Sequence, residues 1–290
     1  MERSFPWVKG HGTRNDFVLL PDPDGSVHGE LDPALVRWLC DRRAGIGADG
    51  VIRVVRTVSY LPAQAQATEA EWFMDYHNAD GSVSEMCGNG IRVLGRYLWD
   101  QGLAAEDQLR IATRGGVRTL HRGPGGSSTV EMGVPSGGQA TAEVTVAGRT
   151  WPATPVTIPN PHAVAVVEDL ADAGPLLQAP QLAPPDAFPA GANVEFVVRR
   201  GPRHIALRVW ERGVGETPSC GTGACAAAWA LMRADGLPAG WTCAVDVPGG
   251  TLTVAERGDG EVLLGGPAEL VVRGLVDPWA AGLLPVWTPS

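Results

Sequence analysis

The chain has 290 residues, of which 44% are hydrophobic and 19% charged, with a formal net charge of −9. This length favours two domains, because single cores rarely grow beyond about 250–300 residues. The acidic balance argues against a nucleic-acid partner, since phosphate binding requires a basic surface, and no apolar run approaches the ~20 residues of a membrane-spanning helix.

The first half is predicted to alternate strands with two helices. Asp32 followed by Pro33 marks a helix start, and its apolar residues continue to about Arg42. Alternating alanine and glutamine predicts a solvated loop over 59–71. Strands are expected at 17–20 and 72–77.

The second half repeats this strand-rich pattern. Strands are predicted at 194–198, 205–210 and 250–254, and residues 122–128 read as a linker or a hairpin tip. Because strands outnumber helices, we expect an α+β fold made of two domains.

Two short sequences in the chain are nearly alike. Cys87 and Cys220 each begin a Cys-Gly-x-Gly sequence, and apolar residues at helical spacing follow both. Further pairs match in the same order, namely 15–17 with 160–162, 47–49 with 191–193, and Asn78 with Glu211. The chain therefore reads as two related halves.

The chemistry of the paired cysteines follows from their expected place at helix N-termini. A positive helix end favours thiolate over thiol, and the adjacent glycines let backbone N–H groups approach a bound carboxylate. A thiolate can remove a proton from one face of a carbon while a thiol returns one to the other face. The predicted outcome is inversion of configuration.

Lysine and cysteine usage limits the cofactors. Lys9 is the only lysine, so a pyridoxal phosphate Schiff base is not expected. Five cysteines without an export signal indicate reduced thiols in a cytoplasmic protein, and Cys40, Cys225 and Cys243 are predicted to be core residues. No second ligand pair accompanies Cys220 and Cys225, so no metal site is expected.

These motifs, together with the Pro159–His162 and Glu211–Thr217 sequences, closely resemble the diaminopimelate epimerase family. The resemblance implies two pseudo-symmetric α/β domains with the active site in the cleft between them, at 1–131 (completed by 266–290) and 132–265. It also implies a cofactor-independent isomerase that interconverts LL- and meso-diaminopimelate for lysine and cell-wall synthesis.

Roles of individual residues follow from the same resemblance. Cys87 and Cys220 would be the acid and base thiols, and His162 would lie near them. Groups that would bind substrate are the side chains of Asn15, Asn78, Asn160, Asn193, Glu211 and Arg212 and the backbone N–H groups of Gly88, Asn89, Gly221 and Thr222. Arg14 and Gly50 depart from the family's usual residues.

Three alternatives stay open at this point. Proline racemases share the two cysteines but typically have histidine where this chain has Asn89, and phenazine-biosynthesis isomerases use a carboxylate instead. A redox switch or binding protein could pair Cys87 with Cys220 in a disulfide without turnover. The sequence does not distinguish a monomer from a homodimer.

Overall fold

A computed structural model describes residues 4–137 and 141–276. The described chain divides into two compact units, one of residues 4–12, 16–128 and 268–276 and one of residues 13–15, 129–137 and 141–267. Residues 277–290, part of the segment expected to complete the first domain, lie outside the described residues. Within the described residues strands greatly outnumber α-helices, which confirms the α+β prediction.

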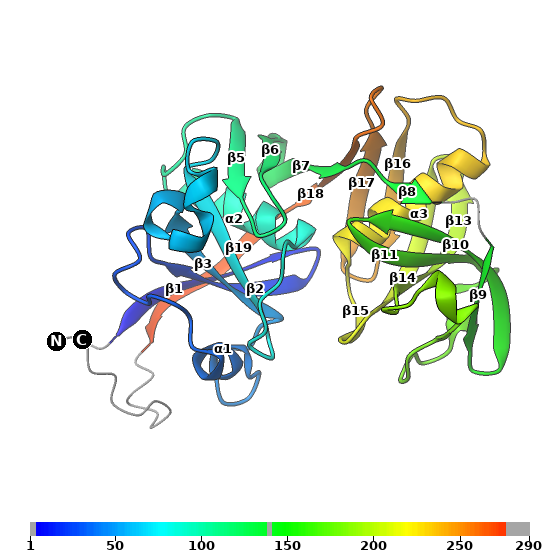
Figure 1. Cartoon of the computed structure of the whole chain (residues 1–290), viewed down its shortest axis with the longest axis horizontal. Helices are drawn as coiled ribbons and strands as arrows, with labels where there is room; N and C mark the ends of the chain where they lie inside the picture. The colour runs from blue at the N-terminus through cyan, green and yellow to red at the C-terminus, as the bar shows by residue number, and fades with distance from the viewer. Residues whose placement is uncertain (1–3, 138–140, 277–290) are drawn as a thin grey trace. The chain divides into compact units, whose positions relative to one another are not determined.

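The first unit contains strands from both ends of the described chain. In Figure 1 the orange-red strand β19 (Glu269–Val276) runs beside the blue strand β1 (Phe5–Gly12), and the two are antiparallel. The unit's other strands are β2 (Asn15–Pro21), β3 (Gly50–Arg56), β4 (Trp72–Asn78), β5 (Gln108–Ala112) and β6 (Arg118–Arg122). Pairing alternates in direction: β2 with β3 and β4 with β5 are parallel, whereas β3 with β4 and β5 with β6 are antiparallel.

Helix α1 (Pro33–Cys40) begins where the sequence predicts. The Asp32 carboxylate accepts a hydrogen bond from the Ala34 N–H, and Pro33 occupies the first turn, where its missing N–H costs nothing. The helix buries Val36 and Leu39 in an apolar cluster with residues of β2 and β3. Helix α1 therefore covers one face of these strands.

The segment predicted as a solvated loop over 59–71 is more ordered than expected. It contains the 3₁₀ helix η2 (Leu61–Gln66), just after η1 (Thr57–Ser59). Ala63 and Ala70 are buried against Phe73, and these two alanines explain why the segment folds back onto the sheet.

The described part of the second unit contains many strands and one α-helix, α3 (Gly221–Ala234). Its strands are β7 (Ser127–Gly133), which begins at the boundary, then β8 (Ser136–Gly137), β9 (Ala142–Val146), β10 (Arg149–Ile158), β11 (Asn160–Val166), β12 (Gln181–Ala183), β13 (Asn193–Gly201), β14 (His204–Glu211), β15 (Gly215–Thr217), β16 (Thr242–Val247), β17 (Gly250–Glu256) and β18 (Val262–Pro267). Its short 3₁₀ helices are η4 (Leu170–Ala173) and η5 (Pro185–Ala187), whereas η3 (Pro124–Gly126) belongs to the first unit.

The two units repeat one topology. In the second unit β11 is parallel to β13, β13 antiparallel to β14, and β14 parallel to β16, with α3 between β14 and β16. In the first unit β2, β3, β4 and β5 pair in the same way, and α2 (Gly88–Asp100) lies between β4 and β5. Each cysteine motif thus leads into the corresponding helix of its unit.

Strand register corrects one detail of the sequence alignment. His162 lies opposite Asn193 in the second unit, and Phe17 lies opposite Gly50 in the first. Because Phe17 corresponds to His162, Asn193 corresponds to Gly50 and not to Asp49. The sequences 47–49 and 191–193 match in residue type, but 47–49 ends one residue before β3, whereas 191–193 ends at the first residue of β13. The match by residue type is therefore displaced by one position.

Among the residues that the structure describes, no helix is both long and apolar enough to cross a membrane.

Candidate active site

Cys87 caps the N-terminus of α2. Its backbone is extended (φ −135°, ψ 119°), and its sulfur accepts a hydrogen bond from the Gly90 N–H at 3.4 Å. The Ile91 N–H bonds to the Cys87 carbonyl and begins the regular helix. The sulfur therefore lies at the positive end of α2, as the sequence predicts.

Cys220 occupies the same position on α3. Its backbone is extended (φ −118°, ψ 116°), and its sulfur lies 3.4 Å from the Gly223 nitrogen, which donates to it. The Thr222 hydroxyl lies 3.4 Å away, and the Asn193 amide donates at 3.7 Å. The matching N-caps confirm the predicted helix starts after both cysteines.

The surroundings of Cys220 oppose thiolate formation. Burial raises its pKa well above the ordinary value, and the carboxylates of Glu211 and Glu195 raise it further, while the donors at Thr222 and Gly223 act in the other direction. The expectation that a helix N-terminus lowers the pKa is therefore wrong for Cys220. Burial and two nearby negative charges outweigh the helix end.

Glu211 is directly associated with this sulfur. It hydrogen-bonds to Cys220 and accepts a hydrogen bond from the Thr217 hydroxyl. Burial raises the pKa of Glu211, Glu195 adds to the rise, and the hydrogen bonds from Thr217 and Cys220 oppose it. The carboxyl of Glu211 thus lies beside the thiol of Cys220 at the N-terminal end of α3.

Four of the predicted residues gather near Cys220. The Asn193 oxygen accepts from the Arg212 backbone N–H at 2.9 Å, and the Arg212 guanidinium donates to the Ala190 carbonyl at 2.7 Å. His162 is fully buried, and its Nε2 lies 3.2 Å from the Asn160 side-chain oxygen. Together with Glu211 and Thr222, these residues form one polar cluster in the second unit.

The predicted residues of the first unit lie at the ends of β4 and α2. Asn78 ends β4 opposite Gly50 and donates to the Ser82 hydroxyl at 3.0 Å. Asn89 is buried, and its side-chain oxygen accepts from Arg92 at 2.9 Å. Asn15 begins β2, directly after a turn in which Thr13 and Arg14 both have positive φ.

Two buried ionic residues beside the cysteine motifs were missed by sequence reasoning. Arg92 donates to the Gly88 carbonyl and so supports the first turn of α2 from within the helix. Glu195 lies in β13, where its side chain pairs with His162. The sequence signal for Glu195 was its position as a single glutamate inside the apolar run 194–198. A carboxylate in such a run requires a ligand or a buried partner.

The remaining cysteines are core residues, as predicted. Cys40, Cys225 and Cys243 are buried, and burial raises the pKa of Cys40 to about 12 and that of Cys243 to about 11. Across residues 4–137 and 141–276, no three His, Cys, Asp or Glu side chains gather as a metal site.

The third glycine position of each motif allows a paired test. A Cβ on Gly223 would lie 2.7 Å from a Glu195 carboxylate oxygen that His162 holds, whereas a Cβ on Gly90 would meet the flexible end of Met74 at 2.7 Å. We expect Gly223→Ala to lower the free energy of unfolding by roughly 2 kcal/mol and Gly90→Ala by about 1 kcal/mol less, measured by urea unfolding. Equal effects would contradict the fixed position of Glu195.

Comparisons with known proteins agree with this geometry. The family model described as "Diaminopimelate epimerase" matches residues 7–137 and 154–271. A diaminopimelate epimerase of Streptomyces coelicolor is 54% identical over 98% of this chain and 100% of its own length, and one of Thermobifida fusca is 47% identical over 92% and 96%.

Solved structures share the fold at much lower identity. A hydroxyproline epimerase from Agrobacterium vitis superposes with a TM-score of 0.67 at 16% identity, covering 97% of this chain and 95% of its own. A PhzF-family phenazine biosynthesis protein from Bacillus anthracis also has a TM-score of 0.67, at 15% identity, over 94% and 99%. The prediction of an isomerase from the paired cysteine motifs is confirmed, and this chain belongs to the diaminopimelate epimerase family.

Proposed function

We propose that this protein interconverts LL- and meso-diaminopimelate by a cofactor-independent, two-base reaction of Cys87 and Cys220, in the synthesis of lysine and peptidoglycan precursors. The observation that carries the proposal is the pair of cysteine N-caps, each on the corresponding helix of two units with one topology. Relatives of up to 54% identity named diaminopimelate epimerase support the choice of substrate.

The reaction needs one proton acceptor and one proton donor. A thiolate takes the α-proton from one face of the substrate carbon, and the other thiol gives its proton to the opposite face, which exchanges the two protonation states. The carbanion that forms between these steps places charge on the α-carboxylate. Backbone N–H groups at 88–89 and 221–222 are the proposed donors that stabilise this charge, each worth about 3 kcal/mol when well placed.

The proposed binding groups suit both ends of the substrate. Diaminopimelate carries an ammonium and a carboxylate at each end, so its site requires donors and acceptors for both. Arg212 is the proposed partner of a carboxylate and Glu211 that of an ammonium. The amides of Asn15, Asn78, Asn160 and Asn193 add neutral donors and acceptors, which bind a zwitterion without a net buried charge.

The test is isotope exchange combined with isomer analysis. Incubated in heavy water with LL-diaminopimelate, the protein should produce meso-diaminopimelate carrying one deuterium at the inverted carbon. L-Proline and L-lysine serve as controls, since each lacks the second amino-acid end. Turnover of proline alone would indicate a proline racemase, and no exchange with any substrate would indicate a binding protein or redox switch.

The cofactor prediction has a separate readout. Lys9 donates to the Gly47 carbonyl at 2.5 Å and pairs with Asp16 at 3.0 Å, so its ammonium is already engaged. We propose that no pyridoxal phosphate takes part. Aldimine absorbance in the purified protein, or activity that requires added pyridoxal phosphate, would contradict this.

The proposed setting is the cytoplasm, with a small-molecule substrate and neither nucleic acid nor membrane as partner. A net charge of −9 supports the absence of a nucleic-acid partner. A homodimer is the proposed alternative to a monomer, and size-exclusion chromatography with light scattering distinguishes the two.

A further inference from the structure

A buried ionisable pair lies within the sheet of the second unit. Glu195 is 0% exposed, and its Oε1 lies 2.7 Å from Nδ1 of His162, which is also 0% exposed. The other carboxylate oxygen is buried without a hydrogen-bond partner among the described residues. Such a carboxylate is costly to bury, so its retention in an apolar strand requires a reason other than stability.

The carboxylate lies against the first turn of α3. A Cβ on Gly223 would come within 2.7 Å of Glu195 Oε1, so only glycine fits over this oxygen. The N–H of the same Gly223 donates to the Cys220 sulfur at 3.4 Å. One residue of α3 therefore touches the buried carboxylate on one side and the thiol on the other.

The first unit has no charge at the equivalent place. Strand register makes Ile52 the counterpart of Glu195 and Phe17 the counterpart of His162. A Cβ on Gly90, the counterpart of Gly223, would meet side-chain carbons of Met74, Ile52 and Phe17. The strand side chains beneath Gly90 are thus apolar, whereas a carboxylate lies beneath Gly223.

The ionisable groups that face Cys220 come from three strands. Glu211 of β14 hydrogen-bonds to the thiol, Glu195 of β13 acts from beneath the helix, and His162 of β11 pairs with Glu195. Both carboxylates raise the pKa of Cys220, in addition to burial. By donating its Nδ1–H to Glu195, the imidazole is held in one orientation beside the amide of Asn160.

We propose that Glu195 is a positioning residue: it holds His162 beneath α3 and keeps Cys220 protonated, so that Cys220 rests as the thiol member of the pair in the free protein. The inference deepens the proposed function and rests on it for the catalytic meaning of that state. The strand positions beneath the two helix ends differ, with Glu195 and His162 in the second unit and Ile52 and Phe17 in the first, so the resting protein is asymmetric although its topology is duplicated.

The experiment measures the pH dependence of alkylation at each cysteine. Iodoacetamide reacts with thiolates, and peptide mapping reports Cys220 and Cys87 separately in one sample. Burial changes the rate at all pH values, but the pH of half-maximal rate reports ionisation alone. In the wild type we expect Cys220 to reach its half-maximal alkylation rate at a higher pH than free cysteine, whose pKa is about 8.5.

Glu195→Gln keeps the shape and removes the charge. We expect the Cys220 curve to move to lower pH, with about a tenfold faster reaction at pH 8, and the Cys87 curve to stay in place. Glu195→Asp keeps the charge and should leave the Cys220 midpoint near that of the wild type. Asp235→Asn removes a charge from the other end of α3, where Asp235 pairs with Arg199, and should move neither curve.

Three results would overturn the proposal. An unchanged Cys220 midpoint in Glu195→Gln would remove the role of the charge, and equal shifts at both cysteines would indicate general loosening of the fold. A wild-type Cys220 that titrates at or below free cysteine would overturn it without any variant. Alkylation requires no turnover, so its result does not depend on whether the protein has the proposed epimerase activity.

A kinetic readout distinguishes positioning from substrate binding. Glu195→Gln should move the alkaline limb of the kcat/KM profile to lower pH, because the thiol acid is lost earlier, and should leave KM unchanged. A raised KM with an unchanged pH profile would place Glu195 among the substrate-binding residues instead.

Discussion

Replacing either Cys87 or Cys220 by alanine is expected to lower the rate of epimerisation at least about 10³-fold while the protein stays folded. A two-base reaction loses its acceptor or its donor in each variant, so no inversion can be completed. Each side chain caps its helix through a weak N–H···S contact at 3.4 Å, so the loss of stability should be small. Chromatographic separation of LL- and meso-diaminopimelate gives the rate.

The control lies one turn further along α3. Cys225 is buried in the helix and takes no part in the proposed reaction, so Cys225→Ala should retain activity.

Isotope exchange adds a sharper readout for Cys87→Ala and Cys220→Ala. Each single variant keeps one thiol, which reaches only one face of the substrate's α-carbon. Residual exchange should therefore be confined to one stereoisomer of the substrate, and the two variants should exchange opposite stereoisomers.

Equal activity in Cys87→Ala and the wild type, or in Cys220→Ala and the wild type, would refute the two-base scheme. Loss of activity in Cys225→Ala at unchanged stability would show that the thiol assignment is incomplete. Circular dichroism and thermal unfolding of all three variants distinguish loss of chemistry from loss of fold.

Local sequence signals predicted where the α-helices begin, and the internal duplication predicted that the two units are related. Asp32 and Pro33 fix the start of α1 by a side-chain cap and a proline ring, both of which act within three residues. The cysteine and glycine spacing likewise fixed the starts of α2 and α3. Signals of this kind need no knowledge of tertiary contacts.

The properties of the site were harder to predict, because they depend on residues distant in the chain. The helix end suggested a low pKa for Cys220, but burial raises this pKa, and Glu211 and Glu195, which come from other strands, raise it further. Asp49 was matched with Asn193 by residue type, whereas the strand register assigns Gly50. The length of a glycine-rich loop cannot be deduced from its composition.

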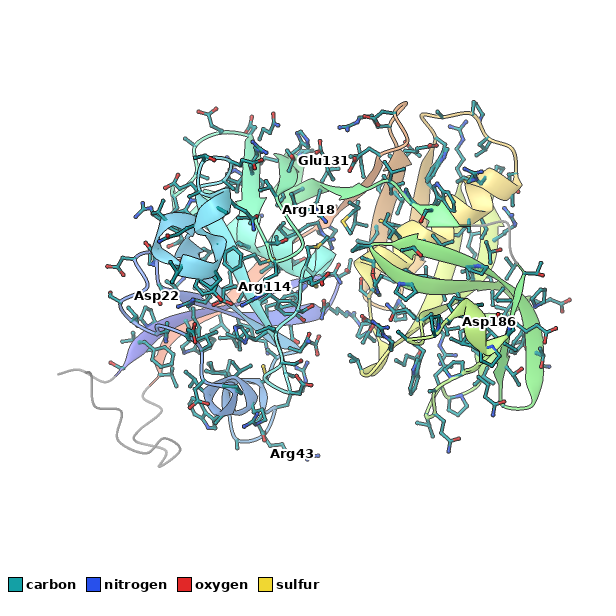
Figure 2. All side chains as sticks on the ribbon, viewed as in Figure 1. Asp22, Arg43, Arg114, Arg118, Glu131 and Asp186 are labelled. Atoms are coloured by element: carbon teal, nitrogen blue, oxygen red, sulfur yellow. The ribbon has the colours of Figure 1, made fainter. Side chains whose placement is uncertain are left out.

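The same reasoning explains why a buried ion cluster in the first unit was not foreseen. Arg53 and Asp75 face each other across β3 and β4 in otherwise apolar strands, with 2% and 1% exposure. Arg53 donates to Asp75 at 2.8 Å and lies 3.6 Å from Asp22, while Arg114 and His77 contact the other oxygen of Asp75 at 2.5 and 3.0 Å. Asp22 and Arg114 are labelled in Figure 2.

Asp75→Asn is expected to lower the free energy of unfolding by about 3–5 kcal/mol at pH 7, the largest stability effect predicted for a single residue of this protein. In the variant an NH₂ group replaces one of the carboxylate oxygens, so it faces donors that it cannot accept from. The buried guanidinium of Arg53 is then left with only the more distant carboxylate of Asp22. The measurement is urea unfolding at pH 7. Asp100→Asn, which breaks an exposed pair with Arg96 on α2, is the control and should cost no more than about 0.5 kcal/mol.

The pH dependence gives an independent check of the cause. Burial by itself would raise the pKa of Asp75, but the hydrogen bond from His77 and the charges of Arg53 and Arg114 bring it down to about 2. A carboxylate with a depressed pKa in the folded state stabilises the protein above its unfolded-state pKa of about 3.9, and this contribution disappears as the pH falls through about 2. The contribution amounts to roughly 2 kcal/mol.

Wild-type stability should therefore fall between about pH 4 and pH 2, whereas Asp75→Asn lacks this titration. The difference in free energy of unfolding between the two proteins should shrink as the pH is lowered over this range. A constant difference from pH 5 to pH 2 would show that the variant acts through packing and not through the lost charge.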